Sequence, residues 1–387
     1  MKRNFLFILL LCLCTHFTKG EHMTNEKTFT FEKNPLIRDK FTADPAPMVY
    51  NGRLYLYVGH DEYYEGQDSA SGGREFNITE WLCYSTDDMK TWVDHGSVLK
   101  PTDFEWAVGE AWASQVVEKN GKFYYYTTVQ AGEPNAGKAI GVAVGDSPTG
   151  PFTDAIGKPL ITDKMTDNGA RGWWNDIDPT VLIDQEGQAW LYWGNGTCFA
   201  AKLKPNMIEL DGEISVIDVP NYTEGPWLHY RNGIYYLTYA SMGAGRENIS
   251  YATSHSAGGP WTPQGELTGM AANSFTIHPG IIEYKGKWYL FYHNAVLTIN
   301  GIQGAIGRRS VCFGELQYNE DGTIKLFQQD NFDIPLNSGM TLTSPNKKVC
   351  MKLNAPLASS EHPGKVTLQV ETGVIIYIWR EGLQIVL

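Results

Sequence analysis

Four ionisable residues lie eight or nine positions ahead of glycines that recur in one pattern along the chain: Asp44, Asp178, Glu224 and His278. Carboxyl groups held close together push their pKa values apart, so that one stays protonated while another is ionised near neutral pH. Glycosidic cleavage needs such a pair, one group to protonate the leaving oxygen and one carboxylate opposite it. An aspartate before proline is also a common turn former, and a lone histidine is commonly structural. The register shared by all four favours a common site.

The shared distance of these residues from the glycines reflects a sequence pattern that is repeated five times. Five stretches, among them "NGRLYLYVGHDE" and "NGKFYYYTTVQ", combine a glycine turn with an aromatic-rich strand, and their glycines are Gly52, Gly121, Gly187, Gly233 and Gly286. Asn-Gly between two strand-like runs is the strongest short-range signal for a hairpin. Repeated four-stranded antiparallel units with glycine and aromatic signatures indicate a β-propeller. We therefore predict an all-β fold, a five-bladed β-propeller with a short C-terminal β extension. A β-sandwich or a β-helix is the alternative.

In a propeller the first strand of each blade lines the central axis, so the four ionisable residues should face one another across a shallow funnel. The second blade offers residues 112–114 at the equivalent place. Tryptophan rings present apolar faces suited to the C–H surfaces of a sugar. We assign that role to Trp112, Trp174 and Trp227. The sequence thus predicts a sugar-binding pocket with grouped carboxyl groups.

The amino-acid composition limits the classes of protein to which this chain can belong. The chain has 387 residues, of which 42% are hydrophobic and 13% aromatic, enough for a large core. Its formal charge of −12 argues against a nucleic-acid partner, which requires a basic surface, and no protein partner is predicted. Residues 1–20 have a basic start, an apolar run and small or polar residues at the end, which is the layout of a secretory signal peptide. We predict a secreted or periplasmic protein, with lipid anchoring as the less favoured alternative.

The cysteines after residue 20 are widely spaced and form no C-x-x-C pair. This spacing matches neither a disulfide framework nor a zinc site. Buried free thiols are therefore predicted for Cys83, Cys198, Cys312 and Cys350.

Longer motifs carry a resemblance to a known family. "FTADPAPMVYNGRLYLY", "WNDIDPTVLIDQEGQAWLYWGN", "TEGPWLHYRNGIYYLTYAS", "FTIHPGIIEYKGKWYLFYHN" and "GRRSVCFGELQYNEDGTI" follow one another between residues 34 and 327. Their order and spacing resemble glycoside hydrolase family 43, five-bladed propeller enzymes that hydrolyse arabinose- and xylose-containing plant polysaccharides with inversion. The resemblance implies a catalytic propeller over residues 30–327.

The resemblance also implies roles for single residues. Asp44 would be the general base and Glu224 the general acid, while Asp178 would stay ionised, raise the pKa of the acid and orient it. An inverting pair of carboxyl groups stands roughly 6.5–9.5 Å apart. Arg309 in "GRRSV" would reach the sugar, with Arg308 as the alternative in register.

His278 matches a histidine that lies on the propeller axis in this family and meets water or a cation, often calcium. The sequence contains no calcium loop of the D-x-D-x-D-G type. We therefore expect no required cofactor, and a structural calcium at His278 as the one metal to consider.

The substrate is inferred from resemblance. The stretch from Asn34 to Glu62 resembles members that remove α-L-arabinofuranosyl branches from arabinoxylan, which is the predicted activity. An exo-β-1,4-xylosidase or an arabinan-degrading enzyme is the alternative, and a non-catalytic sugar-binding propeller is a further one. Binding alone does not require three grouped carboxylates, which disfavours the last. Residues 63–80 are an insert that would wall a groove for the polysaccharide backbone, or would be an ordinary surface loop.

Residues 328–387 follow the predicted propeller and are too few for a full carbohydrate-binding β-sandwich. They are interpreted as a C-terminal extension. It could be a fragment of an ancillary β-sandwich, a strand packed on the propeller or the product of a truncated reading frame.

Overall fold

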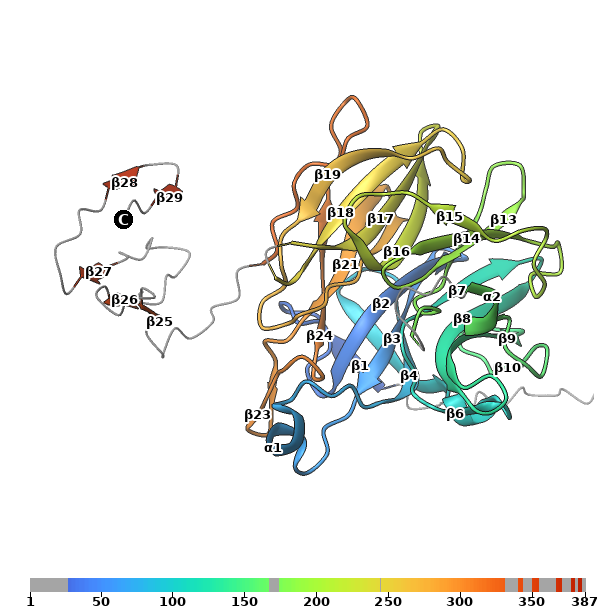
Figure 1. The fold of residues 1–387 in the computed structure, drawn as a ribbon, viewed down its shortest axis with the longest axis horizontal. Coiled ribbons are helices and arrows are strands. Elements are labelled where there is room, and N and C mark those ends of the chain that lie inside the picture. The colour runs from blue at the N-terminus through green and yellow to red at the C-terminus, as the bar shows by residue number, and fades with distance from the viewer. Residues whose placement is uncertain are drawn as a thin grey trace, which may run out of the picture.

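The computed structural model describes residues 27–166, 174–243 and 245–330, together with five short strands between 340 and 384 (Figure 1). The predicted signal peptide, residues 1–20, lies outside the described residues. The described residues contain three short helices: α1 (Gln67–Ser71), the 3₁₀ turn Pro101–Asp103 and α2 (Asp163–Thr166). The fold is otherwise built from β-strands, and no helix among the described residues is long and apolar enough to cross a membrane.

Five antiparallel sheets follow one another along the chain as the blades of a β-propeller, as predicted. Neighbouring strands of the sequence pair as hairpins in each blade, while in blade I the first strand β1 pairs with the last strand β5. Blade I contains β1 (Lys27–Thr30), β2 (Phe41–Tyr50), β3 (Arg53–Asp61), β4 (Ile78–Thr86) and β5 (Thr91–Leu99). Blade II contains β6 (Ala107–Gly109), β7 (Ser114–Lys119), β8 (Lys122–Ala131), β9 (Gly137–Gly145), β10 (Thr153–Asp154) and β11 (Ile161–Thr162). Blade III contains β12 (Thr180–Ile183), β13 (Ala189–Trp193), β14 (Cys198–Leu203) and β15 (Ser215–Ile217). Blade IV contains β16 (Tyr222–Arg231), β17 (Ile234–Met242), β18 (Glu247–Ser254) and β19 (Thr262–Thr268). Blade V contains β20 (Gly280–Tyr284), β21 (Lys287–Asn294) and β24 (Ser310–Leu316), with the small hairpin β22 (Thr298–Ile299) and β23 (Ile302–Gln303) between the last two.

The ring closes between the two ends of the propeller. The main sheet of blade V has three strands rather than the four predicted for each unit, and the segment ahead of β2 and the start of β2 hydrogen-bond β24 and the residue before it. The Leu36 N–H donates to the Val311 carbonyl at 2.8 Å, and the Thr42 N–H donates to the Arg309 carbonyl at 2.9 Å. These two hydrogen bonds connect the first blade to the last blade beside Arg309.

The hairpin turns follow the sequence prediction. Asn51 and Gly52 have φ values of 49° and 76°, and Asn232 and Gly233 have 50° and 86°. Two successive positive φ values define the turn whose twist matches that of the flanking strands. The turn of blade III is longer, because β12 ends at Ile183 and β13 begins only at Ala189.

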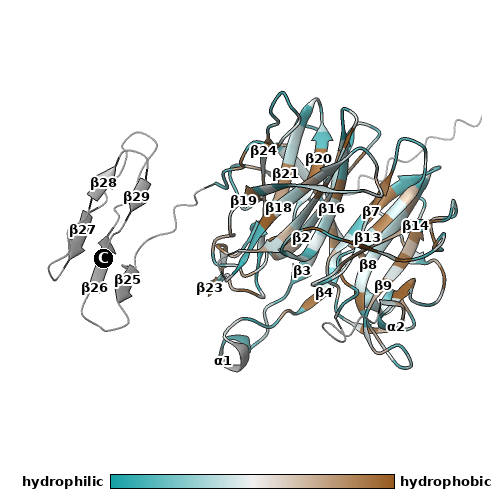
Figure 2. Ribbon diagram, turned by 45° about the horizontal axis from the view of Figure 1, so that its top comes forward, coloured by the Kyte–Doolittle hydropathy of each residue, from teal (hydrophilic) through white to brown (hydrophobic). Residues whose placement is uncertain are grey.

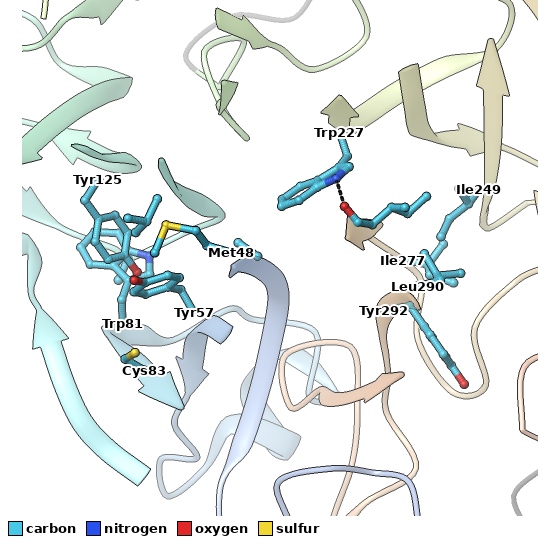
Figure 3. Close-up of a cluster of buried hydrophobic side chains, with 14 of the residues drawn as sticks. Met48, Tyr57, Trp81, Cys83, Tyr125, Trp227, Ile249, Ile277, Leu290 and Tyr292 are labelled. Carbon is cyan, nitrogen blue, oxygen red and sulfur yellow. Dashed lines mark hydrogen bonds between the residues drawn. The ribbon is translucent and has the colours of Figure 1, made fainter. Parts of the chain in front are cut away.

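The core lies within and between the blades, and hydrophobic stretches run along the packed strands (Figure 2). One large cluster joins several blades and includes Tyr57, Trp81, Tyr125, Trp227 and Leu290 (Figure 3). Close-packed aromatic side chains of this size contribute a large share of the burial free energy. Cys83, Cys198 and Cys312 are buried free thiols, as predicted.

The C-terminal extension contains short strands in two sheets. One sheet is formed by β25 (Met340–Thr343), β26 (Cys350–Asn354) and β27 (Thr367–Val370), and the other by β28 (Tyr377–Trp379) and β29 (Gly382–Gln384). The side chain of Cys350 lies outside what the structure describes. The assignment of this segment to an ancillary β-sandwich stays a prediction.

Candidate active site

Two of the grouped acidic residues, Asp44 and Asp178, have an unusual backbone conformation with a positive φ. Asp44 and Asp178 have φ values of 54° and 60° and each precedes a proline. The pairing of β2 with β3 is interrupted between Ala43 and Ala46, so Asp44 occupies a bulge. A positive φ at a residue other than glycine is uncommon and clusters at functional sites.

In blade IV the equivalent backbone position is held by Gly225, not by Glu224. Gly225 has a φ of 56° and precedes Pro226, as Asp44 and Asp178 precede their prolines. A Cβ added to Gly225 would lie 2.9 Å from the His278 ring, so this position excludes a side chain. The prediction of one shared register for all four ionisable residues is therefore wrong by one residue for Glu224. Its carboxyl group enters the site from the position just before the bulge.

His278 lies between the carboxyl groups. Its Nδ1 is 3.1 Å from Asp44 Oδ1, and its Nε2 is 3.1 Å from Glu224 Oε1 and 3.7 Å from Asp178 Oδ2. Because Asp44 and Glu224 contact opposite ring nitrogens of His278, their nearest oxygens are at most about 8 Å apart, which is compatible with the roughly 6.5–9.5 Å of inverting glycosidases. The structure thus brings together the four residues that the sequence grouped.

Further contacts hold the carboxyl groups in place. The Gly225 N–H donates to Asp178 Oδ2 at 3.0 Å, and the Asn195 side-chain amide donates to Glu224 Oε2 at 2.5 Å. The Asp178 N–H donates to Thr128 Oγ1 at 2.8 Å, which links blade III to blade II. The sequence analysis identified neither Asn195 nor Thr128, because both lie outside the repeated register.

A cavity of about 350 Å³ opens over these residues. Asp44, Asp178, Glu224, His278 and Arg309 all line it. The apolar part of its wall includes two of the predicted sugar-binding tryptophans, Trp112 and Trp174, together with Phe76 and Phe275.

The insert at residues 63–80 contributes to this wall. It supplies Phe76 and Ile78 to the cavity and contains α1. Arg308 ties the insert to the loop ahead of β24, because its guanidinium donates to Gln67 Oε1 at 2.6 Å and to Asp68 Oδ1 at 2.7 Å. Arg308 is therefore a structural contact of the wall, and Arg309 is the arginine of the cavity.

Trp227 does not line the 350 Å³ cavity. Its side chain is buried in the core on β16, and its indole N–H donates to the Ile281 carbonyl at 2.9 Å (Figure 3). It borders a narrow space of about 20 Å³ lined also by the prolines that follow Asp44, Asp178, Gly225 and His278. The sequence-based assignment of Trp227 to sugar binding is corrected to a packing role.

This difference predicts opposite effects for two tryptophan substitutions. Trp227→Phe should lower the free energy of unfolding by about 1–3 kcal/mol, since the Ile281 carbonyl loses its donor, and should leave KM unchanged. Trp174→Ala should raise KM about tenfold through loss of a sugar-facing ring with little change in stability, because 37% of Trp174 is exposed. Urea unfolding and steady-state kinetics measure the two quantities. A raised KM without loss of stability in Trp227→Phe would contradict the reassignment.

Arg309 connects two buried carboxylates. Its Nη1 donates to Asp44 Oδ1 at 2.9 Å, while Nε and Nη2 each donate to an oxygen of Asp61 at 3.0 Å. The backbone N–H of Arg309 also donates to Asp61, at 2.8 Å. Asp61, at the end of β3, was missed by the sequence analysis. The sequence signal for Asp61 was weak, because it was simply an acidic residue at the end of the aromatic strand "LYLYVGHDE".

These contacts set the protonation of the site. Burial alone would raise the pKa of Asp44, but the charges of Arg309 and His278 outweigh it and hold the pKa below its usual value. Burial raises the pKa of Asp178 to about 8, with the charge of Glu224 adding to the effect. For His278, burial opposes protonation, yet Asp44 and Asp178 raise its pKa to about 10.

The raised pKa of Asp178 argues against the expectation that this residue stays ionised. Asp178 is itself deeply buried and takes up a proton near neutral pH. The charge of Glu224 adds to the effect of burial on Asp178, as expected for two carboxyl groups in one buried site. Asp44, by contrast, remains ionised beside Arg309 and protonated His278.

The residues around His278 can be compared with the ligands that a calcium ion requires. Asp178, Glu224 and His278 offer ligand atoms that lie within 4.8 Å of one another. Calcium takes six to eight oxygen ligands, whereas this set has two carboxylates and an imidazole. Both ring nitrogens of His278 already contact carboxylates. The residues present do not form a calcium cage, and no step proposed below passes through a metal.

Comparison with known proteins places this geometry in a family. The sequence profile of glycosyl hydrolases family 43 matches residues 32–324. An arabinoxylan arabinofuranohydrolase of Bacillus subtilis is 31% identical over 83% of this chain and 69% of its own length. A xylosidase/arabinosidase of Bacteroides ovatus is 31% identical over 76% of this chain and 97% of its own length.

Solved structures give the same result. An α-L-arabinofuranosidase from Clostridium thermocellum shares 36% identity with a TM-score of 0.59, covering 74% of this chain and 93% of that one. A β-xylosidase/α-arabinofuranosidase from a compost microbial metagenome, in a calcium-free form with xylotriose, shares 26% identity with a TM-score of 0.66, covering 78% of this chain and 98% of that one. The five-bladed propeller and the match over most of the chain show that the protein belongs to glycosyl hydrolases family 43 and is a glycoside hydrolase acting on O-glycosyl bonds.

Proposed function

We propose that this glycoside hydrolase removes α-L-arabinofuranosyl branches from arabinoxylan-type polysaccharide with inversion at the anomeric carbon. The observation that carries the proposal is the placement of Asp44 and Glu224 on opposite sides of His278, both lining one cavity. That spacing leaves room for a water molecule between a general base and the sugar, as single displacement requires.

In this proposal Asp44 is the general base. It is ionised at neutral pH, because Arg309 and His278 hold its pKa low. Its Oδ1 is fixed by the Arg309 guanidinium at 2.9 Å, which orients the carboxylate. Asp44 takes a proton from the water that attacks the anomeric carbon.

Glu224 is the general acid. Its side chain is 13% exposed, compared with 5% for Asp178, so Glu224 is the carboxyl group better able to reach a leaving oxygen. Asn195 holds its second oxygen. Burial and the charge of Glu224 disfavour the ionised form of Asp178. Two carboxyl groups this close disfavour a double negative charge, so a proton is retained between them and is available for transfer from Glu224 to the leaving oxygen. The transition state is oxocarbenium-like, and the ionised Asp44 stabilises its positive charge.

The substrate preference rests on the relatives. The two curated relatives compared above are named for arabinofuranose release and for combined xylosidase and arabinosidase activity. The apolar wall that includes Phe76, Trp112 and Trp174 suits stacking against the C–H face of a sugar. Exo-β-1,4-xylosidase activity is the second candidate, because the B. ovatus relative is named for both activities.

The proposal predicts specific products. Purified protein incubated with wheat arabinoxylan should release free arabinose and leave the xylan backbone intact, as followed by anion-exchange chromatography. Proton NMR of 4-nitrophenyl α-L-arabinofuranoside hydrolysis should show the β-anomer first. Arabinan and xylo-oligosaccharides serve as competing substrates. Xylose as the main product would favour the second candidate, and first release of the α-anomer would contradict the single displacement.

A further inference from the structure

A fourth carboxyl group, that of Glu247, lines the same cavity and has no part in the mechanism above. Glu247 is the first residue of β18 and is 1% exposed. It lies opposite Met242 in the pairing of β17 with β18, and Met242 also lines the cavity. A buried acid at this place is costly unless something in the site uses it.

The position of Glu247 is fixed by the segment ahead of blade V. Its backbone N–H donates to the Phe275 carbonyl at 3.1 Å. The Ile277 N–H donates to its side-chain Oε2 at 3.3 Å. Within the described ranges, this is the one hydrogen bond donated to the Glu247 carboxyl group. A carboxyl group offers about four lone-pair sites, so most of its hydrogen-bonding capacity is left for a ligand.

The charge around Glu247 favours its neutral form. Burial raises its pKa well above the usual value, and the charge of Glu224 adds to this effect. His278 and the Ile277 N–H act in the opposite direction, and Asp178 again raises the pKa. A neutral carboxyl group is both a donor and an acceptor, which suits recognition of a sugar hydroxyl.

We propose that Glu247 is a specificity-determining residue whose carboxyl group hydrogen-bonds a hydroxyl of the sugar held in the cavity. The inference rests on the proposed hydrolysis of pentosides and names a residue that recognises the pentose. A site built to hydrogen-bond a hydroxyl discriminates strongly against a ligand that lacks it, because the buried partner is then left unpaired. Glu247 would therefore act on the choice of sugar and leave the chemistry to Asp44 and Glu224.

The test combines two substitutions with substrates that lack single hydroxyls. Glu247→Gln keeps a donor and an acceptor, and we expect its kcat/KM on 4-nitrophenyl α-L-arabinofuranoside to stay within about threefold of the wild-type value. Glu247→Leu removes both, and we expect about a tenfold loss, mainly in KM. Glu283→Gln, an exposed carboxylate on β20, is the matched control and should change nothing. Thermal unfolding of each variant verifies that it is folded.

The decisive measurement is whether the rate loss caused by removing one sugar hydroxyl depends on the presence of the Glu247 carboxyl group. The 2-, 3- and 5-deoxy arabinofuranosides should each lower the wild-type rate, and one of these losses should disappear in Glu247→Leu, where the partner is already gone. A merely structural role of Glu247 would not produce coupling to one hydroxyl. If the wild type cleaves the parent glycoside and all three losses persist in Glu247→Leu, the inference is overturned while the proposed function stands. If the wild type cleaves neither the arabinofuranoside nor the matching xyloside, the proposed function fails and this inference with it.

Discussion

Glu224→Gln should lower kcat on arabinoxylan by about 10²–10⁴-fold, the range attributable to general acid catalysis. The glutamine has nearly the same size and keeps an oxygen for the Asn195 amide, which now lies 2.5 Å from Glu224 Oε2. It has no proton to give to the leaving oxygen. Substrate affinity should change little, so the loss is expected in kcat and not in KM.

The leaving group provides the internal check of this prediction. A xylan hydroxyl is a poor leaving group unless it is protonated, whereas nitrophenolate is a weak base that departs without help. Glu224→Gln should therefore lose far less activity on 4-nitrophenyl α-L-arabinofuranoside than on arabinoxylan. Glu283→Gln is again the control for the chemical change itself. An equal loss on both substrates would contradict the role of Glu224 as the acid and point to a general effect on the site.

The parts of this protein that were predicted correctly from sequence are those set by local conformation. The turn at Asn51 and Gly52 needs two positive φ values, and that requirement is met by two neighbouring residues whatever their surroundings. Asp44 and Asp178 were placed on the axis because they lie eight and nine residues ahead of the turn glycines Gly52 and Gly187. The repetition of these local signals predicted the blades and their order.

Glu224 shows where counting along the chain fails. β16 contains irregularities on both sides of Glu224 in its pairing with β17, and a bulge shifts every following residue by one place. At Gly225 the His278 ring, which comes from the segment ahead of blade V, leaves no room for a Cβ, so this position cannot hold the acidic residue. The same irregularity upsets the alternation of faces along β16, by which Trp227 would have been recognised as a core residue.

Asp61 and Glu247 could not be predicted because they do not precede a turn of the repeat. Asp61 ends β3 and meets Arg309 only when the ring closes between blade V and the segment ahead of β2. Glu247 begins β18 and meets the cavity through the segment that contains Phe275 and Ile277. Residues of this kind are brought into a site by tertiary closure, and a single sequence carries no periodic signal for them.

Arg309→Gln should produce the largest loss of stability among the substitutions considered, because it leaves two buried carboxylates without their common cation. Asp44 and Asp61 are 6% and 1% exposed, and Arg309 is 3% exposed. Removing one partner of a buried ion pair costs about 3–5 kcal/mol, since the remaining charge is desolvated and unpaired. Urea unfolding should show this loss at pH 7. Arg53→Gln is the matched control: it breaks a surface ion pair with Asp87, and the change should stay below about 1 kcal/mol.

The pH dependence of Arg309→Gln separates electrostatics from packing. In the wild type the pKa of Asp44 is held below its unfolded value. This lowered pKa contributes stability that is present above the unfolded pKa, about 3.9, and is lost as the pH falls through the folded pKa. The stability difference between wild type and variant should therefore be largest near neutral pH and shrink in acid. Without the guanidinium the pKa of Asp44 rises, so the acidic limb of kcat/KM against pH should move to higher pH. A stability loss that is constant with pH, with an unmoved acidic limb, would assign Arg309 a packing role and remove it as the group that keeps Asp44 ionised.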